Sequence, residues 1–76
     1  MEAYKERFIK EFWELHERLT KLGNMLAKYD NGTLDFTPAC PINMLRTQYY
    51  AMAAYHSVLI ERSKIEDISL TLTVKE

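Results

Sequence analysis

The sequence predicts an all-α protein in which two long helices fold back on each other as an antiparallel hairpin, followed by a short extended tail. Two observations carry this prediction. In two long segments apolar residues recur at alternating steps of four and three, which is the period of helices that pack along one another. Between these segments lie Gly32 and both prolines of the chain, residues that end helices and form turns. A chain of 76 residues is long enough for one small domain only.

The first helix is expected over about residues 2–29, a segment with no proline and a single glycine. Opposite charges stand one helical turn apart on its outer faces, as in Glu14 with Arg18 and Glu17 with Lys21. Its apolar seam consists of Phe8, Phe12, Leu15, Leu19, Leu22, Leu26 and Tyr29. This uninterrupted seam is the face that we expect to pack against the second helix.

A loop is expected over residues 30–40. Gly32 tolerates the left-handed backbone conformation that ends helices. Leu34 and Phe36 are large and apolar, which indicates a loop that folds over the end of the helices. Pro41 then suits the first turn of a second helix, where its missing N–H costs nothing.

The second helix is expected over about residues 41–67. Its seam keeps the same steps but contains polar residues: Leu45, Gln48, Met52, Tyr55, Leu59 and Arg62. Four further residues flank this seam: Met44, Ala51, Val58 and Ile65. At about 1.5 Å of rise per residue each helix is roughly 40 Å long, so the two match in length and can form a hairpin.

The tail, residues 68–76, changes to a period of two, with apolar and polar residues alternating from Ser69 to Val74. This is the pattern of a short strand or of a frayed end. A single strand has no partner within this chain. An ordered tail is therefore expected to pair with another copy or to lie against the helices.

Apolar residues outside the two seams predict a homo-oligomer, a helical bundle made of several hairpins. A second stripe on the first helix consists of Ile9, Trp13, His16 and Thr20, and the second helix carries Tyr49, Tyr50, Ala53, Ala54 and Ile60 off its seam. In a monomer, Trp13, Tyr49 and Ile60 would form an exposed patch larger than soluble monomers usually tolerate. A symmetric dimer or a dimer of dimers is the default expectation.

The charge balance excludes several partners. Ten Lys and Arg against eleven Asp and Glu give a net charge of -1, so no overall field attracts a long nucleic acid or an anionic membrane. The single cysteine, Cys40, cannot form an intramolecular disulfide, and the sequence has neither a signal-peptide pattern nor an apolar run that spans a bilayer. We therefore expect a cytoplasmic protein with no membrane partner.

The sequence carries no visible catalytic constellation. It has no HExxH or CxxC motif, no histidines four residues apart and no glycine-rich phosphate loop, which argues against a metal or a nucleotide cofactor. Cys40 and His56 would lie about four helical turns apart, too far for a nucleophile and its base. We expect a non-enzymatic protein without a cofactor.

Arg62 at a predicted seam position requires a partner, because a buried guanidinium without one is costly. One interpretation is an ion pair with Glu11, Glu14 or another acid of the first helix. The other is a ligand site between protomers, in which basic side chains donate to a phosphate and aromatic rings stack on bases. The candidate ligand-binding residues are Arg62, Arg18, Lys21, Gln48, Tyr55, Trp13 and His16, with Tyr49 and Tyr50 as further stacking candidates.

Two segments carry a family resemblance. Residues 8–26 (FIKEFWELHERLTKLGNML) and 45–62 (LRTQYYAMAAYHSVLIER) resemble a family of short helical proteins encoded by phages, including crAss-like phages. The second segment contributes the pattern L-x2-Q-x3-M-x2-Y-x3-L-x2-R, from Leu45 to Arg62. The resemblance implies phage origin, and so the cytoplasm of an infected bacterial host, and a helical hairpin. It implies no reaction.

Three classes of function remain open. The favoured hypothesis is a counter-defence sponge, an oligomer whose pockets sequester a cyclic nucleotide or a related signal of host immunity. The second is a protein-directed inhibitor of a host defence protein, such as an anti-CRISPR, which presents a helix face to its target. The third is a structural or assembly accessory without a ligand.

Overall fold

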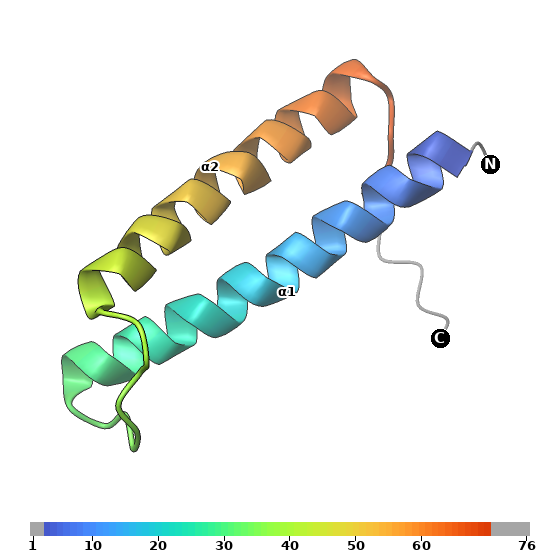
Figure 1. Ribbon diagram of the computed structural model, residues 1–76. Helices are drawn as coiled ribbons and strands as arrows, with labels where there is room; N and C mark the ends of the chain where they lie inside the picture. The colour runs from blue at the N-terminus through green and yellow to red at the C-terminus, as the bar shows by residue number, and fades with distance from the viewer. Residues whose placement is uncertain (1–2, 71–76) are drawn as a thin grey trace.

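The computed structural model describes residues 3–70, which form two helices, α1 (Ala3–Asn31) and α2 (Ile42–Ile65). They run antiparallel and are joined by one loop, with the end of the described chain crossing back over the first half of α1 (Figure 1). The predicted all-α hairpin is confirmed, with α1 ending two residues later than expected and α2 spanning less than the expected range. Neither helix of this described part has a stretch long and apolar enough to span a bilayer.

Backbone hydrogen bonds end α1 at the expected turn. Gly32 has a φ of +74°, the left-handed conformation that glycine adopts without strain. Its N–H donates to the carbonyl of Tyr29 at 3.1 Å, and the N–H of Thr33 donates to that of Lys28 at 2.9 Å. These two bonds satisfy carbonyls that would otherwise lack partners at the helix end.

A second left-handed residue turns the chain after α2. Asp67 has a φ of +57°, and the N–H of Ile68 donates back to the carbonyl of Ser63 at 2.8 Å. The turn directs the following residues towards α1 (Figure 1). As a result Ile68, only 6% exposed, becomes a core residue although it lies outside both helices.

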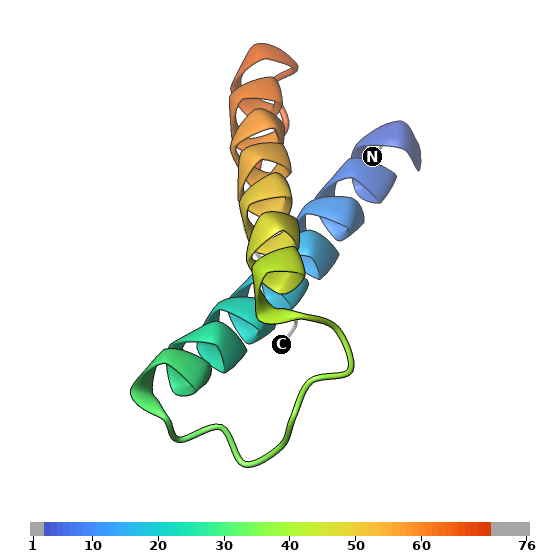
Figure 2. The ribbon, with the colours of Figure 1, turned by 60° about the vertical axis from the view of Figure 1, so that its left-hand side comes forward.

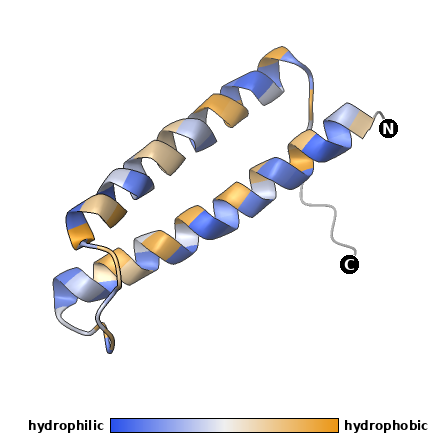
Figure 3. Ribbon diagram, in the orientation of Figure 1, coloured by the Kyte–Doolittle hydropathy of each residue, from blue (hydrophilic) through white to orange (hydrophobic). Residues whose placement is uncertain are grey.

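The hydrophobic core lies between the first half of α1, the second half of α2 and the segment that follows it. Its buried cluster consists of Phe8, Phe12, Leu15, Leu59 and Ile68. Leu59 is 1% exposed and is the most deeply buried large side chain of the described residues. Figure 3 shows apolar residues recurring along both helices between polar ones, as the heptad spacing predicted. The buried seam of α1 includes four predicted members: Phe8, Phe12, Leu15 and Leu26.

The predicted seam of α2 is wrong at every second position, where the residue that faces α1 is the next one along the chain. The side chains of Gln48 and Tyr55 are exposed, whereas Ser63, next to Arg62, is buried. The face towards α1 instead consists of Leu45, Tyr49, Met52, His56, Leu59 and Ser63, all buried or half-buried. Polar residues can occupy this face because they are hydrogen-bonded there: the Ser63 hydroxyl donates to the carbonyl of Ile60 at 2.6 Å, and His56 Nε2 lies 3.1 Å from Nδ1 of His16 on α1.

The single chain also does not expose the apolar patch that was expected of a monomer, since Trp13, Tyr49 and Ile60 are all half-buried. The segment that follows α2 covers Trp13: the indole Nε1 donates to the carbonyl of Leu70 at 3.1 Å. The described start of the tail thus lies against the helices. The remainder of the alternating segment, from residue 71 on, lies outside the described residues.

Other large apolar side chains remain exposed. Figure 2 shows the helices crossing obliquely, so that each helix keeps an outer face. The exposed large apolar residues are Tyr4, Tyr29, Phe36, Met44, Tyr50, Tyr55, Val58 and Ile65. In the loop, Leu34 is half-buried while Phe36 is 56% exposed, so the expected folding of the loop over the helix ends applies to Leu34 alone.

Candidate functional site

Arg62 forms its ion pair with Glu66, just after the end of α2, and not with an acid of α1. Its Nε donates to Glu66 Oε2 at 2.7 Å and its Nη2 to Glu66 Oε1 at 3.3 Å. The guanidinium carbon also lies 4.9 Å from the ring centroid of Phe8, a cation–π contact. The expected ion pair with an acid of α1 is therefore wrong. Because Arg62 lies beside the seam and its side chain is 43% exposed, it needs no carboxylate from α1.

Three further predicted residues make short-range contacts at the surface. Arg18 pairs with Glu14 at 4.0 Å and Lys21 with Glu17 at 3.2 Å, as the charge spacing predicted. Gln48 Nε2 donates to the sulfur of Met52 at 3.7 Å. Exposed pairs of this kind hold a side chain only weakly.

Tyr55 contacts α1 from an exposed position. Its hydroxyl donates to Glu11 Oε2 at 3.3 Å. Burial, followed by the charge and the hydrogen bond of Glu11, raises the pKa of Tyr55. The phenol is therefore a hydrogen-bond donor at neutral pH.

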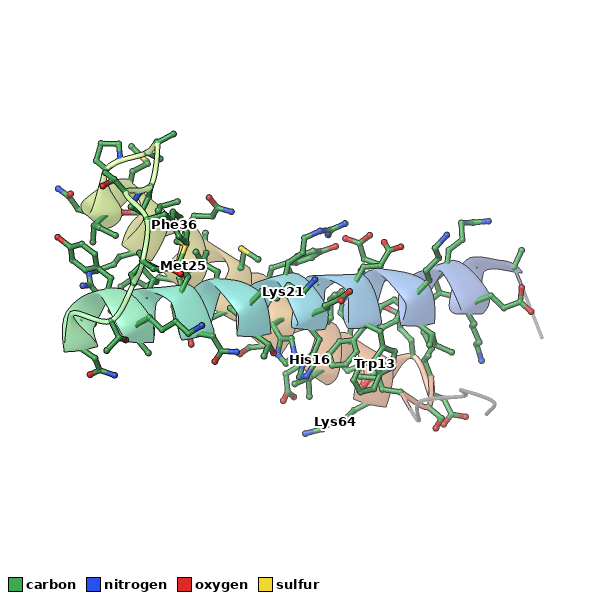
Figure 4. All side chains as sticks on the ribbon, turned by 90° about the horizontal axis from the view of Figure 1, so that it is seen from below. Trp13, His16, Lys21, Met25, Phe36 and Lys64 are labelled. Carbon is green, nitrogen blue, oxygen red and sulfur yellow. The ribbon has the colours of Figure 1, made fainter. Side chains whose placement is uncertain are left out.

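Trp13 and His16 belong to an aromatic cluster between the helices. Figure 4 shows both side chains on the same side of α1. His16 Nδ1 and His56 Nε2 are 3.1 Å apart, and the ring centroid of His56 lies 4.8 Å from that of Phe12. Burial and, second, the charge of His16 lower the pKa of His56. Within residues 3–70, these histidines do not belong to a group of three or more metal-ligating side chains.

Of the seven predicted residues, only Trp13 and His16 thus belong to one cluster, and none of the seven lines the three cavities that follow. The cavity with charged side chains in its lining has a volume of about 220 Å³ and lies between the second half of α1 and the first half of α2. Its lining consists of Gly23, Leu26, Ala27, Asp30, Arg46, Tyr49 and Tyr50. We call it the Gly23 cavity.

Two small residues of α1, Gly23 and Ala27, belong to the lining of the Gly23 cavity. A Cβ atom on Gly23 would lie 3.0 Å from Cε1 of Tyr49, closer than Cβ contacts normally come. The glycine thus lets the Tyr49 ring lie directly on α1, and Ala27 continues the narrow surface one turn further on. The ring of Tyr50 meets that of Tyr49 edge-on, at 5.8 Å between centroids and 72° between planes.

An ion pair stands at the rim of the Gly23 cavity. Arg46 Nη1 donates to Asp30 Oδ2 at 3.2 Å, and Nη2 donates to Asp30 Oδ1, so that two parallel bonds join the groups. The hydrogen bond from Arg46 lowers the pKa of Asp30, and the same bond raises the pKa of Arg46. Electrostatic interactions with Tyr50 and Tyr29 raise the pKa of Arg46 further.

Two other cavities are lined without charged side chains. One, of about 270 Å³, lies under the loop beside Tyr29, Leu34, Phe36 and Pro38. The other, of about 250 Å³, lies at the start of α2 beside Pro41 and Met44. The Gly23 cavity is the one of the three that combines aromatic rings, a cation and two small residues of α1.

Sequence reasoning identified the two tyrosines of this cavity but missed Gly23, Asp30 and Arg46. A glycine inside a 29-residue helix was the available signal, since glycine lowers helix stability and so usually has a packing reason. The pairing of Asp30 with Arg46 crosses the loop and has no signature in helical spacing.

Comparison with protein families gives one match, to a family described as Sequestin, over residues 2–65. The matched range includes all the lining residues of the Gly23 cavity and ends before the segment that covers Trp13. No curated protein and no solved structure matches the chain.

Proposed function

Because the chain belongs to the Sequestin family, we propose that it is a non-enzymatic phage counter-defence protein that binds and sequesters a nucleotide-derived immune signal. The family name denotes sequestration, which requires tight binding and no chemical step. The phage origin rests on the resemblance of residues 8–26 and 45–62 to short phage-encoded helical proteins.

The Gly23 cavity is the feature that supports a nucleotide as the ligand. It places a guanidinium beside two tyrosine rings, and these are the groups that bind a phosphate and stack on a base. Aromatic stacking contributes about 1–3 kcal/mol per base, so one such contact supplies a useful part of the affinity of a sponge.

A homo-oligomer with ligand pockets between protomers is part of this proposal. Along α2, Met44, Ala51, Val58 and Ile65 are spaced by seven residues, and all four are exposed. Ile65 is 82% exposed and Met44 59%. A strict seven-residue apolar line on an uncovered helix face is typical of a contact with another helix, and a second copy of α2 supplies one.

A thermal-shift screen against cyclic dinucleotides, cyclic trinucleotides and ADP-ribose derivatives tests the function, with the mass in solution measured by light scattering. A ligand at 100 times its Kd stabilises the folded state by about 2.7 kcal/mol, which raises the Tm of a domain this small by roughly 10–20 °C. We expect one ligand class to give such a shift, and a mass of at least twice the 9.0 kDa of one chain.

The other outcomes contradict separate parts of the proposal. An oligomer without any shift contradicts the nucleotide ligand and favours a protein-directed inhibitor of a host defence enzyme. A monomer that still binds a nucleotide contradicts the pockets between protomers. A shift accompanied by conversion of the ligand contradicts the non-enzymatic role.

A further inference from the structure

We propose that the Gly23 cavity is the docking site of the sequestered ligand: one nucleobase enters against Tyr49 and Tyr50, and a phosphate of the same ligand binds Arg46. This inference rests on the proposed function and adds to it the place and orientation of the ligand. It assigns the site to residues other than the seven that the sequence suggested.

The size of the cavity fits part of a nucleotide signal. Its volume of about 220 Å³ is below the roughly 300–1,000 Å³ of pockets that enclose a whole drug-sized ligand. One planar base fits such a space, while the rest of a cyclic dinucleotide or trinucleotide extends beyond the mouth. That outer part is then available to a second protomer, in agreement with pockets shared between copies.

The shape of the cavity depends on Gly23. Without a side chain at this position the Tyr49 ring lies against α1, with its Cε1 3.0 Å from the place of the missing Cβ. Tyr50 meets that ring edge-on and is itself 66% exposed. Because Tyr50 is largely exposed beside the cavity, its ring offers a surface on which a base can stack.

Arg46 supplies the charge for the phosphate. A guanidinium has five N–H donors in a planar fork that matches a carboxylate and a phosphate equally well. Two of these donors contact Asp30, so the carboxylate oxygens occupy positions that phosphate oxygens can take. Both partners are substantially exposed, with side-chain exposures of 36% for Arg46 and 52% for Asp30. Solvent weakens such a pair, so the singly charged phosphodiester of a cyclic nucleotide, or the doubly charged terminal phosphate of AMP, can compete with Asp30 for Arg46.

Titration of the isotopically labelled protein with AMP, GMP, adenosine and inorganic phosphate, followed by NMR, tests the site directly. We expect AMP or GMP to shift the amide signals of Gly23, Ala27, Arg46 and Tyr50, and AMP to bind at least tenfold more tightly than adenosine. In Arg46→Gln the advantage of AMP over adenosine should disappear, whereas adenosine itself should bind as before.

Matched variants separate the site from general effects on the fold. Gly23→Ala should weaken nucleotide binding measurably, because the Tyr49 ring must shift by a few tenths of an ångström to admit the Cβ. Alanine favours the helix, so such a loss is not caused by unfolding. Asn24→Ala and Arg7→Gln, exposed on the same helix, should change the Kd less than twofold. Arg46→Lys keeps the charge but loses the fork, and an intermediate loss is expected.

The possible failures of the site and of the function are distinguishable. If a ligand of the thermal-shift screen stabilises Arg46→Gln and Gly23→Ala as much as the unchanged protein, the site is wrong and the function stands. NMR signal shifts confined to residues outside the cavity would likewise contradict the site and leave the function standing. If no ligand of the screen stabilises the protein and neither AMP nor GMP shifts a signal, both the site and the function are wrong.

Discussion

Leu59→Ala tests the packing that holds the hairpin together. Leu59 is 1% exposed and belongs to a cluster with residues of α1 and with Ile68. The substitution removes three carbon atoms, at about 0.8 kcal/mol per buried group, and leaves a cavity that adds to the loss. We expect a total destabilisation of about 3 kcal/mol.

The magnitude is large for a chain of this length. At roughly 0.05–0.15 kcal/mol per residue, a 76-residue domain has a free energy of unfolding of about 4–11 kcal/mol. A loss of about 3 kcal/mol corresponds to a fall in Tm of roughly 12–24 °C. Urea and thermal unfolding followed by circular dichroism at 222 nm measure both quantities.

Phe36→Ala is the control for Leu59→Ala. Phe36 is the larger side chain, but it is 56% exposed and lies in the loop. Its removal should cost less than about 1 kcal/mol, because exposed side chains contribute little to stability. Equal losses in the two variants, or a loss below about 1 kcal/mol for Leu59→Ala, would refute the packing described here.

Three further predictions follow from the same contacts. Burial and the neighbouring His16 lower the pKa of His56, so the unfolded chain binds more protons than the folded protein as the pH falls below about 6.5. Tm should therefore fall as the pH drops through that value, and His56→Gln should reduce this dependence. Ile68→Ala should destabilise the fold by about 2–4 kcal/mol and shift the Trp13 fluorescence to longer wavelength, because the covering segment loses its buried anchor; unchanged emission would show that this segment does not cover the indole. Tyr49→Ala should lower the free energy of unfolding in urea by about 2 kcal/mol, and Gln48→Ala by less than about 0.5 kcal/mol. A larger loss for Gln48→Ala would show that Gln48 faces α1, as the sequence indicated.

The two helices were predictable because their evidence is local and repeated. The steps of four and three in α1 place Phe8, Phe12 and Leu15 on one face whatever the rest of the chain does. The turn at Gly32 was predictable for the same reason, since glycine adopts a positive φ, here +74°, without strain.

The phase of α2 was not predictable from apolar spacing alone. His56 and Ser63 can face α1 because each has a hydrogen-bond partner: His56 Nε2 pairs with His16 of α1, and the Ser63 hydroxyl donates to the carbonyl of Ile60. Hydropathy favours Tyr55 over His56 at a seam, and only the partner across the interface reverses that preference. The same error moved Arg62 into the predicted core.

The Gly23 cavity depends on contacts between distant residues. Asp30 and Arg46 are sixteen residues apart and meet because the loop returns α2 beside the end of α1. The cover over Trp13 comes from Leu70, fifty-seven residues away. Neither contact has a sequence signature, so of the candidates chosen from the sequence only Tyr49 and Tyr50 line this cavity.

Sequestration without chemistry is tested most directly by equilibrium dialysis of the protein, in molar excess, against cyclic dinucleotides, cyclic trinucleotides and ADP-ribose derivatives. The retained ligand is released by heat and identified by mass spectrometry. We predict that one ligand class is depleted from the free compartment and recovered with its mass unchanged. Retention of no ligand, or recovery of a product of different mass, would contradict the proposed role.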